Sequence, residues 1–230
     1  MKLAIIGDFR KENATHVATN SALQHSIDFL GADLDFSWVH TTTIHHGFNP
    51  DDYQGFLIAP GSPYASMENV LEVIRFARLH LVPTLGTCGG FQHMIIEYAR
   101  SVLKVADATH AETDPYASRL VITPLSCSLV GQRLDVSVLP GSRAFALVGA
   151  SFTANYYCNF GLNPEYAAAL DASGFRITGT DADGEVRILE LDGHPFFMGT
   201  LFVPQASSTK ERPQPLVTGF LEAVVVYSNP

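Results

Sequence analysis

The sequence has few cysteines, few basic side chains and no long apolar run, and each scarcity excludes a class of protein. The three cysteines, Cys88, Cys127 and Cys158, are widely spaced, so they form neither a disulfide framework nor a CxxC metal pattern. There are 14 lysines and arginines against 23 acidic residues, a net charge of −9, which argues against a nucleic-acid partner because phosphate binding needs a basic surface. No apolar stretch reaches the roughly 20 residues that span a bilayer.

What remains is a globular composition, with 47% hydrophobic and 16% charged residues in a chain of 230. The opening MKLAIIGDF carries charged residues directly after a short apolar run, so it is interpreted as a first strand and not as a secretory signal. We therefore expect a cytoplasmic protein whose cysteines stay reduced. No linker, repeat or low-complexity tract divides the chain, which predicts one domain over residues 1–230.

The first half alternates between strand-like and helix-like segments. Short apolar runs that stop in turns indicate buried parallel strands, and apolar residues spaced along one face indicate helices. The expected strands cover residues 3–8, 33–40, 53–63 and 82–87, and the expected helices cover 14–30, 67–80 and 90–103. This alternation predicts an α/β fold, with a mostly parallel central sheet and helices on both faces.

The second half changes character near residue 105. The expected strands are 118–130, 133–142, 152–160 and three more within 175–205, and the expected helices are 164–173 and 213–228. The turn sequences DADG and DGHP separate the last three strands. We therefore expect antiparallel strands added to the parallel sheet.

The stretch GTCGG places Cys88 between Gly86 and Gly90, after a strand-like segment and before a helix-like one. A nucleophile on a sharp strand-to-helix turn, a nucleophile elbow, needs small neighbours because the backbone is crowded there. Such a turn points backbone N–H groups at the nucleophile, and these lower a thiol pKa and can hold an oxyanion. The alternative is a buried cysteine at a strand end, with glycines that serve only the turn.

Other motifs occur in a fixed order around this elbow, from residue 3 to about 224: APGSP, GTCGGFQHMIIEYARSVL, DATHAETD, NPEY, DGHPFFMGTLFVPQ and RPQPLVTGFLEAV. Together they resemble the class I glutamine amidotransferase family, in particular the C-terminal glutaminase domain of CTP synthases. The resemblance implies a flavodoxin-like fold with Cys88 as nucleophile. The synthetase half, which binds UTP and ATP in that family, is not among these residues, so a stand-alone protein is expected.

The resemblance also implies roles for residues near Cys88. The backbone N–H groups of Gly61 and Gly89 would form an oxyanion hole. Gln92 and Glu112 would hold the amide or amine group of a ligand. These assignments follow from the matching motifs APGSP, GTCGGFQ and DATHAETD.

Two departures from the family pattern bear on activity. In FVPQ, Val203 stands at the position of the catalytic histidine and Gln205 at that of its glutamate, which gives a degenerate triad: valine takes no proton, and glutamine carries no charge to stabilise an imidazolium. Asn159 replaces the arginine that clamps the α-carboxylate of glutamine, so a bidentate anchor is lost. His93 and His110 are the alternative bases, and each is equally interpretable as an ordinary helix or loop residue.

The sequence therefore predicts a Cys-dependent hydrolase or amidotransferase that acts on a small amide or amine C–N substrate other than glutamine, through a covalent Cys88 intermediate. Ordinary glutaminase activity would be very low. Two alternatives stay open: an inactive module that binds a small ligand or regulates, and a subunit whose partner chain supplies what is missing. We expect no metal and no cofactor, no nucleic-acid or membrane partner, and either a homodimer or a synthetase-type partner chain.

Overall fold

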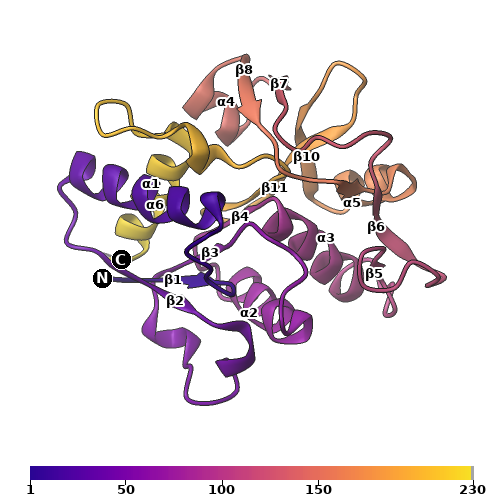
Figure 1. Cartoon of the computed structure of the whole chain (residues 1–230), viewed down its shortest axis with the longest axis horizontal. Helices are drawn as coiled ribbons and strands as arrows, with labels where there is room; N and C mark the ends of the chain where they lie inside the picture. The colour runs from indigo at the N-terminus through magenta and orange to yellow at the C-terminus, as the bar shows by residue number, and fades with distance from the viewer. Residues whose placement is uncertain (229–230) are drawn as a thin grey trace.

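A nine-stranded sheet runs between two layers of helices within residues 1–228, the part of the chain that this computed structural model describes (Figure 1). The strand order is β2-β1-β3-β4-β12-β11-β10-β7-β8, and a smaller sheet has the order β5-β6-β9. The strands are β1 (Lys2–Ile6), β2 (Asp35–Val39), β3 (Gly55–Ile58), β4 (Thr84–Thr87), β5 (Thr109–His110), β6 (Leu120–Pro124), β7 (Arg133–Val138), β8 (Ser151–Asn155), β9 (Phe160–Leu162), β10 (Phe175–Thr180), β11 (Val186–Leu191) and β12 (Phe197–Thr200).

The half of the sheet from β2 to β12 is parallel, and every pairing from β12 to β8 is antiparallel. The central parallel strands are buried on both faces, as β3 (GFLI) and β4 (TLGT) are along their whole length. Such strands must be covered by helices on both sides. The expected α/β fold, with a mostly parallel central sheet and added antiparallel strands, is confirmed.

The helices form two layers. They are α1 (Ala14–Leu30), α2 (Met67–Leu79), α3 (Gly89–Ser101), α4 (Arg143–Val148), α5 (Ala167–Ala172) and α6 (Pro215–Ser228). α1 packs against α6 on one side of the sheet, and α2 packs against α3 on the other (Figure 1). Within the described residues, no helix combines the length and the apolar character that crossing a membrane requires.

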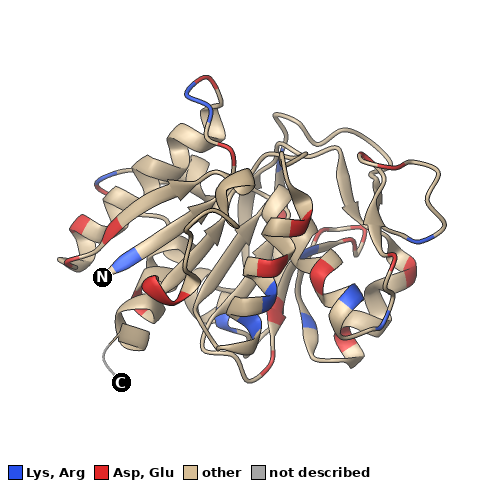
Figure 2. Cartoon of the chain, turned by 90° about the horizontal axis from the view of Figure 1, so that it is seen from below, with Lys and Arg blue, Asp and Glu red and all other residues tan. Residues whose placement is uncertain are grey.

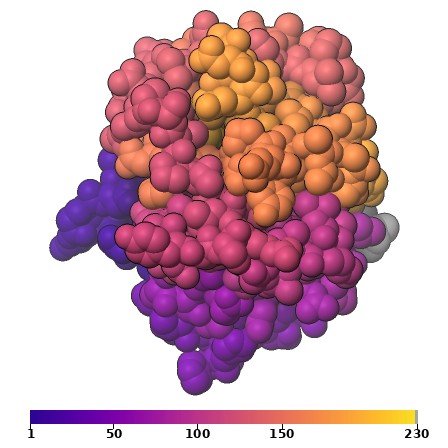
Figure 3. All heavy atoms as spheres, turned by 90° about the vertical axis from the view of Figure 1, so that its right-hand side faces the viewer, coloured from indigo at the N-terminus to yellow at the C-terminus, as the bar shows by residue number. Residues whose placement is uncertain are grey.

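The segment 152–160 is not the single strand that the sequence predicts. β8 ends at Asn155, whose carbonyl accepts a hydrogen bond from the Val203 N–H at 3.0 Å, and the chain then leaves the large sheet. β9 begins at Phe160 and pairs with β6 in the smaller sheet. In the space-filling view the segments around residues 110–125 and 160–175 lie together on one face (Figure 3). Residues 156–159 therefore connect the two sheets.

The strand-to-helix turn at the end of β4 depends on glycines that leave no room for a side chain. A Cβ on Gly90 would lie 2.2 Å from the carbonyl oxygen of Ile58, and one on Gly86 would lie 2.3 Å from the sulfur of Met94. The N-terminal turn of α3 therefore packs directly against the backbone of β3. This close approach fixes the direction in which α3 leaves the sheet.

Replacing Gly90 by alanine should reduce the free energy of unfolding by about 3 kcal/mol, the upper end for overpacking, because the new methyl meets backbone and not a flexible side chain. Gly193→Ala is the control: nothing lies within 4 Å of its Cβ position, and only its φ of +72° opposes a side chain, at a cost of about 1 kcal/mol. Urea unfolding of both variants measures the difference. Equal losses would show that α3 is not in direct backbone contact with β3.

Candidate active site

Cys88 occupies the turn between β4 and α3 in a conformation that L-residues rarely adopt. Its φ is +52° and its ψ is −107°, and it stands at the N-cap of α3. The Cys88 N–H donates to the carbonyl oxygen of Thr200 at 2.8 Å, which ties the end of β4 to the end of β12. Strained backbone of this kind concentrates at functional sites, where the surrounding structure imposes it. The structure therefore contains the sharp elbow that GTCGG predicts.

Three hydrogen-bonding groups surround the Cys88 sulfur. The Cys158 thiol lies 2.7 Å away, with either sulfur able to donate, and the backbone N–H groups of Gly61 and Gly89 also bond the sulfur. The hydrogen bond with Cys158, followed by those from the two glycines, lowers the pKa of Cys88 against the opposing effects of burial and of Glu112. The structure thus brings Gly61 and Gly89 to Cys88, and their service as an oxyanion hole stays a prediction.

Cys158 is the partner that sequence reasoning did not assign. It lies between β8 and β9, 70 residues from Cys88, with a side chain only 3% exposed. Its thiol hydrogen can reach the Cys88 sulfur at 2.7 Å or the carbonyl oxygen of Leu201 at 2.8 Å. The hydrogen bond with Cys88 and burial raise the pKa of Cys158 well above its ordinary value. The pair therefore favours the thiolate on Cys88 over that on Cys158.

A cavity of about 290 Å³ opens over the two sulfurs. Its lining residues are Asn13, Thr15, Pro60, Gly61, Ser62, Cys88, Gln92, Glu112, Val130, Tyr157, Cys158, Asn159 and Phe160. Among these lining residues, all within the described range, Glu112 carries the only carboxyl group, and none is a lysine, arginine or histidine. The predicted site residues Gln92, Glu112 and Asn159 are therefore gathered around Cys88, in surroundings that contain no cation.

The polar side chains of the cavity are held by neighbours. The Glu112 carboxylate accepts a hydrogen bond from the Ser62 hydroxyl at 2.7 Å, and the Asn159 side-chain oxygen accepts one from Ser128 at 2.7 Å. The amide of Gln92 donates to the carbonyl oxygen of Phe160 at 2.9 Å. Glu112 is exposed, so its carboxylate can meet a ligand that enters from solvent.

His93 and His110 both form hydrogen bonds with groups other than the Cys88 sulfur. His93 bonds the carbonyl oxygen of Gly89 through Nδ1 at 2.7 Å. His110 donates from Nε2 to the Gln92 side-chain oxygen at 3.0 Å and accepts the Glu112 N–H on Nδ1. Burial lowers the pKa of His93 to about 4 and that of His110 to about 3. In the described chain neither ring has a hydrogen bond to Cys88, so the geometry does not support either one as its base.

Val203 and Gln205 follow β12 and lie beside the elbow. Val203 is fully buried, and Gln205 is 1% exposed. The Gln205 amide nitrogen donates to the hydroxyls of Thr87 at 3.0 Å and Thr19 at 3.4 Å, while its oxygen has no partner within residues 1–228. Gln205 therefore adjoins Thr87, the residue before Cys88, and neither the Gln205 nor the Val203 side chain can act as a base.

His16 also contributes to the site, and no motif in the sequence indicated it. It is buried between Phe9 and Trp38 in α1, accepts the Arg10 N–H on Nδ1, and meets the carbonyl oxygen of Pro60 through Nε2 at 2.9 Å. That carbonyl belongs to the same peptide unit as the Gly61 N–H, which points at the Cys88 sulfur. His16 therefore fixes the orientation of one predicted oxyanion donor.

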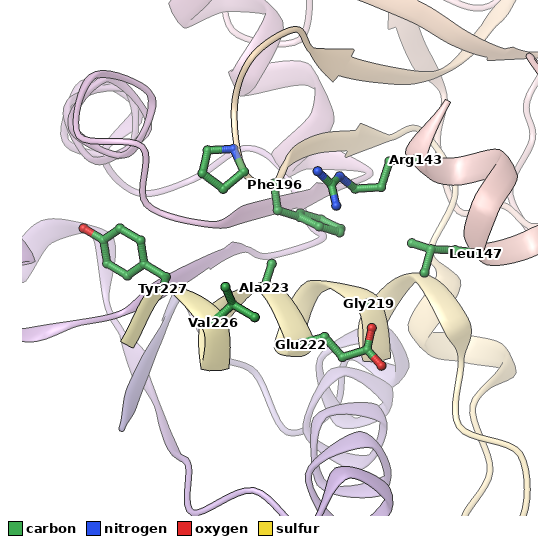
Figure 4. Close-up of a pocket in the computed structure, with 9 residues that line it drawn as sticks. Arg143, Leu147, Phe196, Gly219, Glu222, Ala223, Val226 and Tyr227 are labelled. Atoms are coloured by element: carbon green, nitrogen blue, oxygen red, sulfur yellow. The ribbon is translucent and has the colours of Figure 1, made fainter. Parts of the chain in front are cut away.

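A second cavity, of about 420 Å³, lies along α6 and contains no nucleophile (Figure 4). It is mostly apolar, and its cation, Arg143, sits over the ring of Phe196 at 5.6 Å. Elsewhere, Lys and Arg are scattered among acidic residues along the chain (Figure 2). In residues 1–228, no group of three or more His, Cys, Asp or Glu side chains is placed to hold a metal ion. The cavity over Cys88 is thus the site to which the chemistry points.

Residues 16–223 match the family described as Glutamine amidotransferase class-I. Over its whole length the chain is 30% identical to a CTP synthase of Cyanothece sp., of which it covers 44%, and over 97% of its length it is 33% identical to one of Halobacterium salinarum, of which it covers 42%. The chain thus spans less than half the length of these relatives.

Among solved structures, the glutaminase domain of the Trypanosoma brucei CTPS with bound acivicin superposes with a TM-score of 0.87 at 21% identity, covering 98% of this chain and 94% of that one. A glutamine amidotransferase of Thermotoga maritima gives a TM-score of 0.62 at 11% identity, covering 100% and 98%. These likenesses establish the fold of the chain.

Alkylation of Cys88 by iodoacetamide should follow a pH profile whose midpoint lies below about 8.5, the ordinary value for a cysteine thiol. Cys158→Ala should raise that midpoint, because it removes the largest cause of the lowered pKa. Peptide mapping after timed labelling separates Cys88 from Cys127, which is exposed although the sequence placed it in a strand. A midpoint that the Cys158 variant leaves unchanged would contradict the thiolate–thiol pair.

Acid should destabilise the protein through its buried neutral histidines. The pKa of His93 falls from about 6.5 to about 4 on folding, so the unfolded chain binds more protons in this range and stability is lost as pH drops from 6.5 towards 4. The loss for His93 is about 3 kcal/mol, at about 1.4 kcal/mol per pKa unit. Urea titrations between pH 7 and 4 measure how the free energy of unfolding falls with pH. Compared with wild type, this fall should be shallower for His93→Asn and unchanged for His46→Asn, which replaces an exposed histidine.

Proposed function

The chain belongs to the class I glutamine amidotransferase family, and on that premise we propose that it uses Cys88 as a nucleophile on a small amide or amine C–N substrate other than glutamine. The observation that carries the proposal is the charge of the cavity: the ligand would meet the Glu112 carboxylate and no cation. An ammonium or amide group is compatible with that charge. A free α-carboxylate is not, because burying it unpaired costs several kcal/mol.

The proposed reaction is acyl transfer to sulfur. The Cys88 thiolate attacks the amide carbonyl carbon, and the oxyanion that forms lies against the N–H groups of Gly61 and Gly89. Collapse breaks the C–N bond, the nitrogen takes a proton from water in the cavity and leaves as the amine, and a thioester remains for the resulting hydroxide to hydrolyse. Glu112 holds the amine end of the substrate, with Gln92 and Asn159 on the walls of the cavity.

We further propose that Val203 and Gln205 stand where the family carries its histidine base and the carboxylate that orients it. This assignment is supported by the hydrogen bond from Gln205 to Thr87, the residue next to Cys88. In the described residues the side chain that touches the Cys88 sulfur is a thiol, Cys158, and not an imidazole. Loss of a triad base removes several powers of ten in rate. Glutamine hydrolysis should accordingly fall far below the usual range of about 1–1000 per second.

The absence of an imidazole at Cys88 also favours a second function, a catalytically inactive module that binds a small ligand in the same cavity. The charge of the cavity would select the same ligands for this module as for the enzyme, but the module would bind them without cleaving them. If ammonia is passed on, we propose that a partner chain, either a second copy or a synthetase-type protein, receives it.

The test compares glutamine with 4-aminobutanamide, which differs only by lacking the α-carboxylate. We expect 4-aminobutanamide to raise the unfolding free energy by about 2.7 kcal/mol at a hundredfold excess over Kd, and glutamine to raise it much less. Thermal shift measures binding, and ammonia release, abolished in Cys88→Ala, measures turnover. Binding without ammonia release would favour the inactive module.

Glu112→Gln should weaken binding of 4-aminobutanamide about tenfold, because a charge-assisted hydrogen bond becomes a neutral one. The matched control is Asp114→Asn, which removes the same charge from an exposed position in the same loop outside the cavity. A larger shift with glutamine than with its decarboxylated relative, or equal affinity in Glu112→Gln and wild type, would overturn the substrate proposal.

A further inference from the structure

The two buried thiols at the elbow are already placed for a bond between them. The sulfurs of Cys88 and Cys158 lie 2.7 Å apart, against about 2.05 Å in a disulfide. Both side chains are buried, at 7% and 3% exposure, and both are free thiols. A displacement of a few tenths of an ångström on each side would close the gap.

Each sulfur is held in place by its own backbone contacts. Cys88 is fixed by the elbow and by its N–H bond to Thr200, and the Cys158 thiol rests on the carbonyl oxygen of Leu201 at 2.8 Å. Thr200 and Leu201 are adjacent, so one short segment positions both cysteines. The backbone of this segment therefore determines the positions of both cysteines.

The two thiols are also chemically unequal, in the sense that a two-cysteine redox site requires. Donors around Cys88 favour its thiolate, whereas Cys158 keeps its proton. Oxidation-sensitive cysteines are low-pKa thiolates next to a second, resolving cysteine. The cavity of about 290 Å³ over the sulfurs admits a small oxidant.

We propose that Cys88 and Cys158 form a dithiol site that small hydroperoxides oxidise to an intramolecular disulfide. The Cys88 thiolate attacks the terminal oxygen of the hydroperoxide and the O–O bond breaks, which gives a sulfenic acid on Cys88 and an alkoxide, or hydroxide from hydrogen peroxide, that takes a proton from solvent to leave as alcohol or water. The Cys158 sulfur then attacks the Cys88 sulfur, the S–O bond breaks, and the hydroxide takes the Cys158 proton to leave as water. The two thiols lose two electrons and the peroxide gains them, and a thiol reductant reverses the step by exchange.

The proposal reaches beyond acyl transfer and does not depend on it. With its sulfur in a disulfide, Cys88 has no thiolate with which to attack a carbonyl. Oxidation would therefore switch off any amide chemistry at this site, and reduction would restore it. The disulfide itself requires no amide substrate, so its failure and the failure of the amide proposal are separable.

The experiment treats the reduced full chain with increasing hydrogen peroxide, blocks free thiols with N-ethylmaleimide, and maps peptides without reduction. We expect a Cys88–Cys158 crosslinked peptide, a chain lighter by two hydrogens, and full recovery with dithiothreitol. Cys127→Ser, which removes the exposed third cysteine, should behave as wild type. Cys158→Ser should yield no crosslink and should accumulate Cys88 sulfenic acid that dimedone traps.

Wild-type mapping alone decides the matter if the Cys158 variant does not fold. Accumulation of sulfinic acid on Cys88 without the crosslink would overturn the proposal, because it would mean that Cys158 does not resolve the sulfenic acid. Disulfides only between Cys127 residues of separate chains would overturn it as well. Recovery of the crosslinked peptide in wild type and Cys127→Ser, and in neither Cys88→Ser nor Cys158→Ser, would support it.

Discussion

The hydrogen bond from the Cys88 N–H to the carbonyl oxygen of Thr200, at 2.8 Å, joins the ends of β4 and β12 and sets the geometry of everything around the cavity. Cys88 has a positive φ at this point, and its side chain lines the cavity. The hydrogen bond also fixes the segment that follows β12, where Leu201 supports Cys158 and Gln205 meets Thr87. The glycines of the elbow allow this because the N-terminal turn of α3 can approach the backbone of β3 directly.

Electrostatics at the site are set by burial more than by charge pairing. His93 and His110 lie close to the cavity, yet both stay neutral because burial lowers their pKa values. Glu112 is exposed, and hydrogen bonds lower the pKa of Cys88. The substrate proposal rests on this combination, because the lining of the cavity includes the Glu112 carboxyl group and no lysine, arginine or histidine.

The sequence pattern predicted the elements whose structure depends on residues close together in the chain. The helix over 14–30 and the glycine-flanked elbow follow from spacing, caps and crowding, and both occur as expected. The direct contact of Cys88 with Cys158 does not follow from local spacing, because it joins positions 70 residues apart; the family resemblance places only the segment of Cys158 at the border of the site. The role of His16 was not predicted for a related reason. It depends on a hydrogen bond with the backbone carbonyl of Pro60, 44 residues away, and a sequence motif does not indicate a backbone partner at that distance.

The buried amide of Gln205 has a consequence for how this site can change over time. Its nitrogen is satisfied by two threonine hydroxyls, and its oxygen faces no donor in the described chain. A glutamate there would be a buried charge, and Val203 offers it no cation, so the exchange would cost several kcal/mol of stability. The neutral surroundings of position 205 therefore oppose the introduction of a charge there, independently of any role in catalysis.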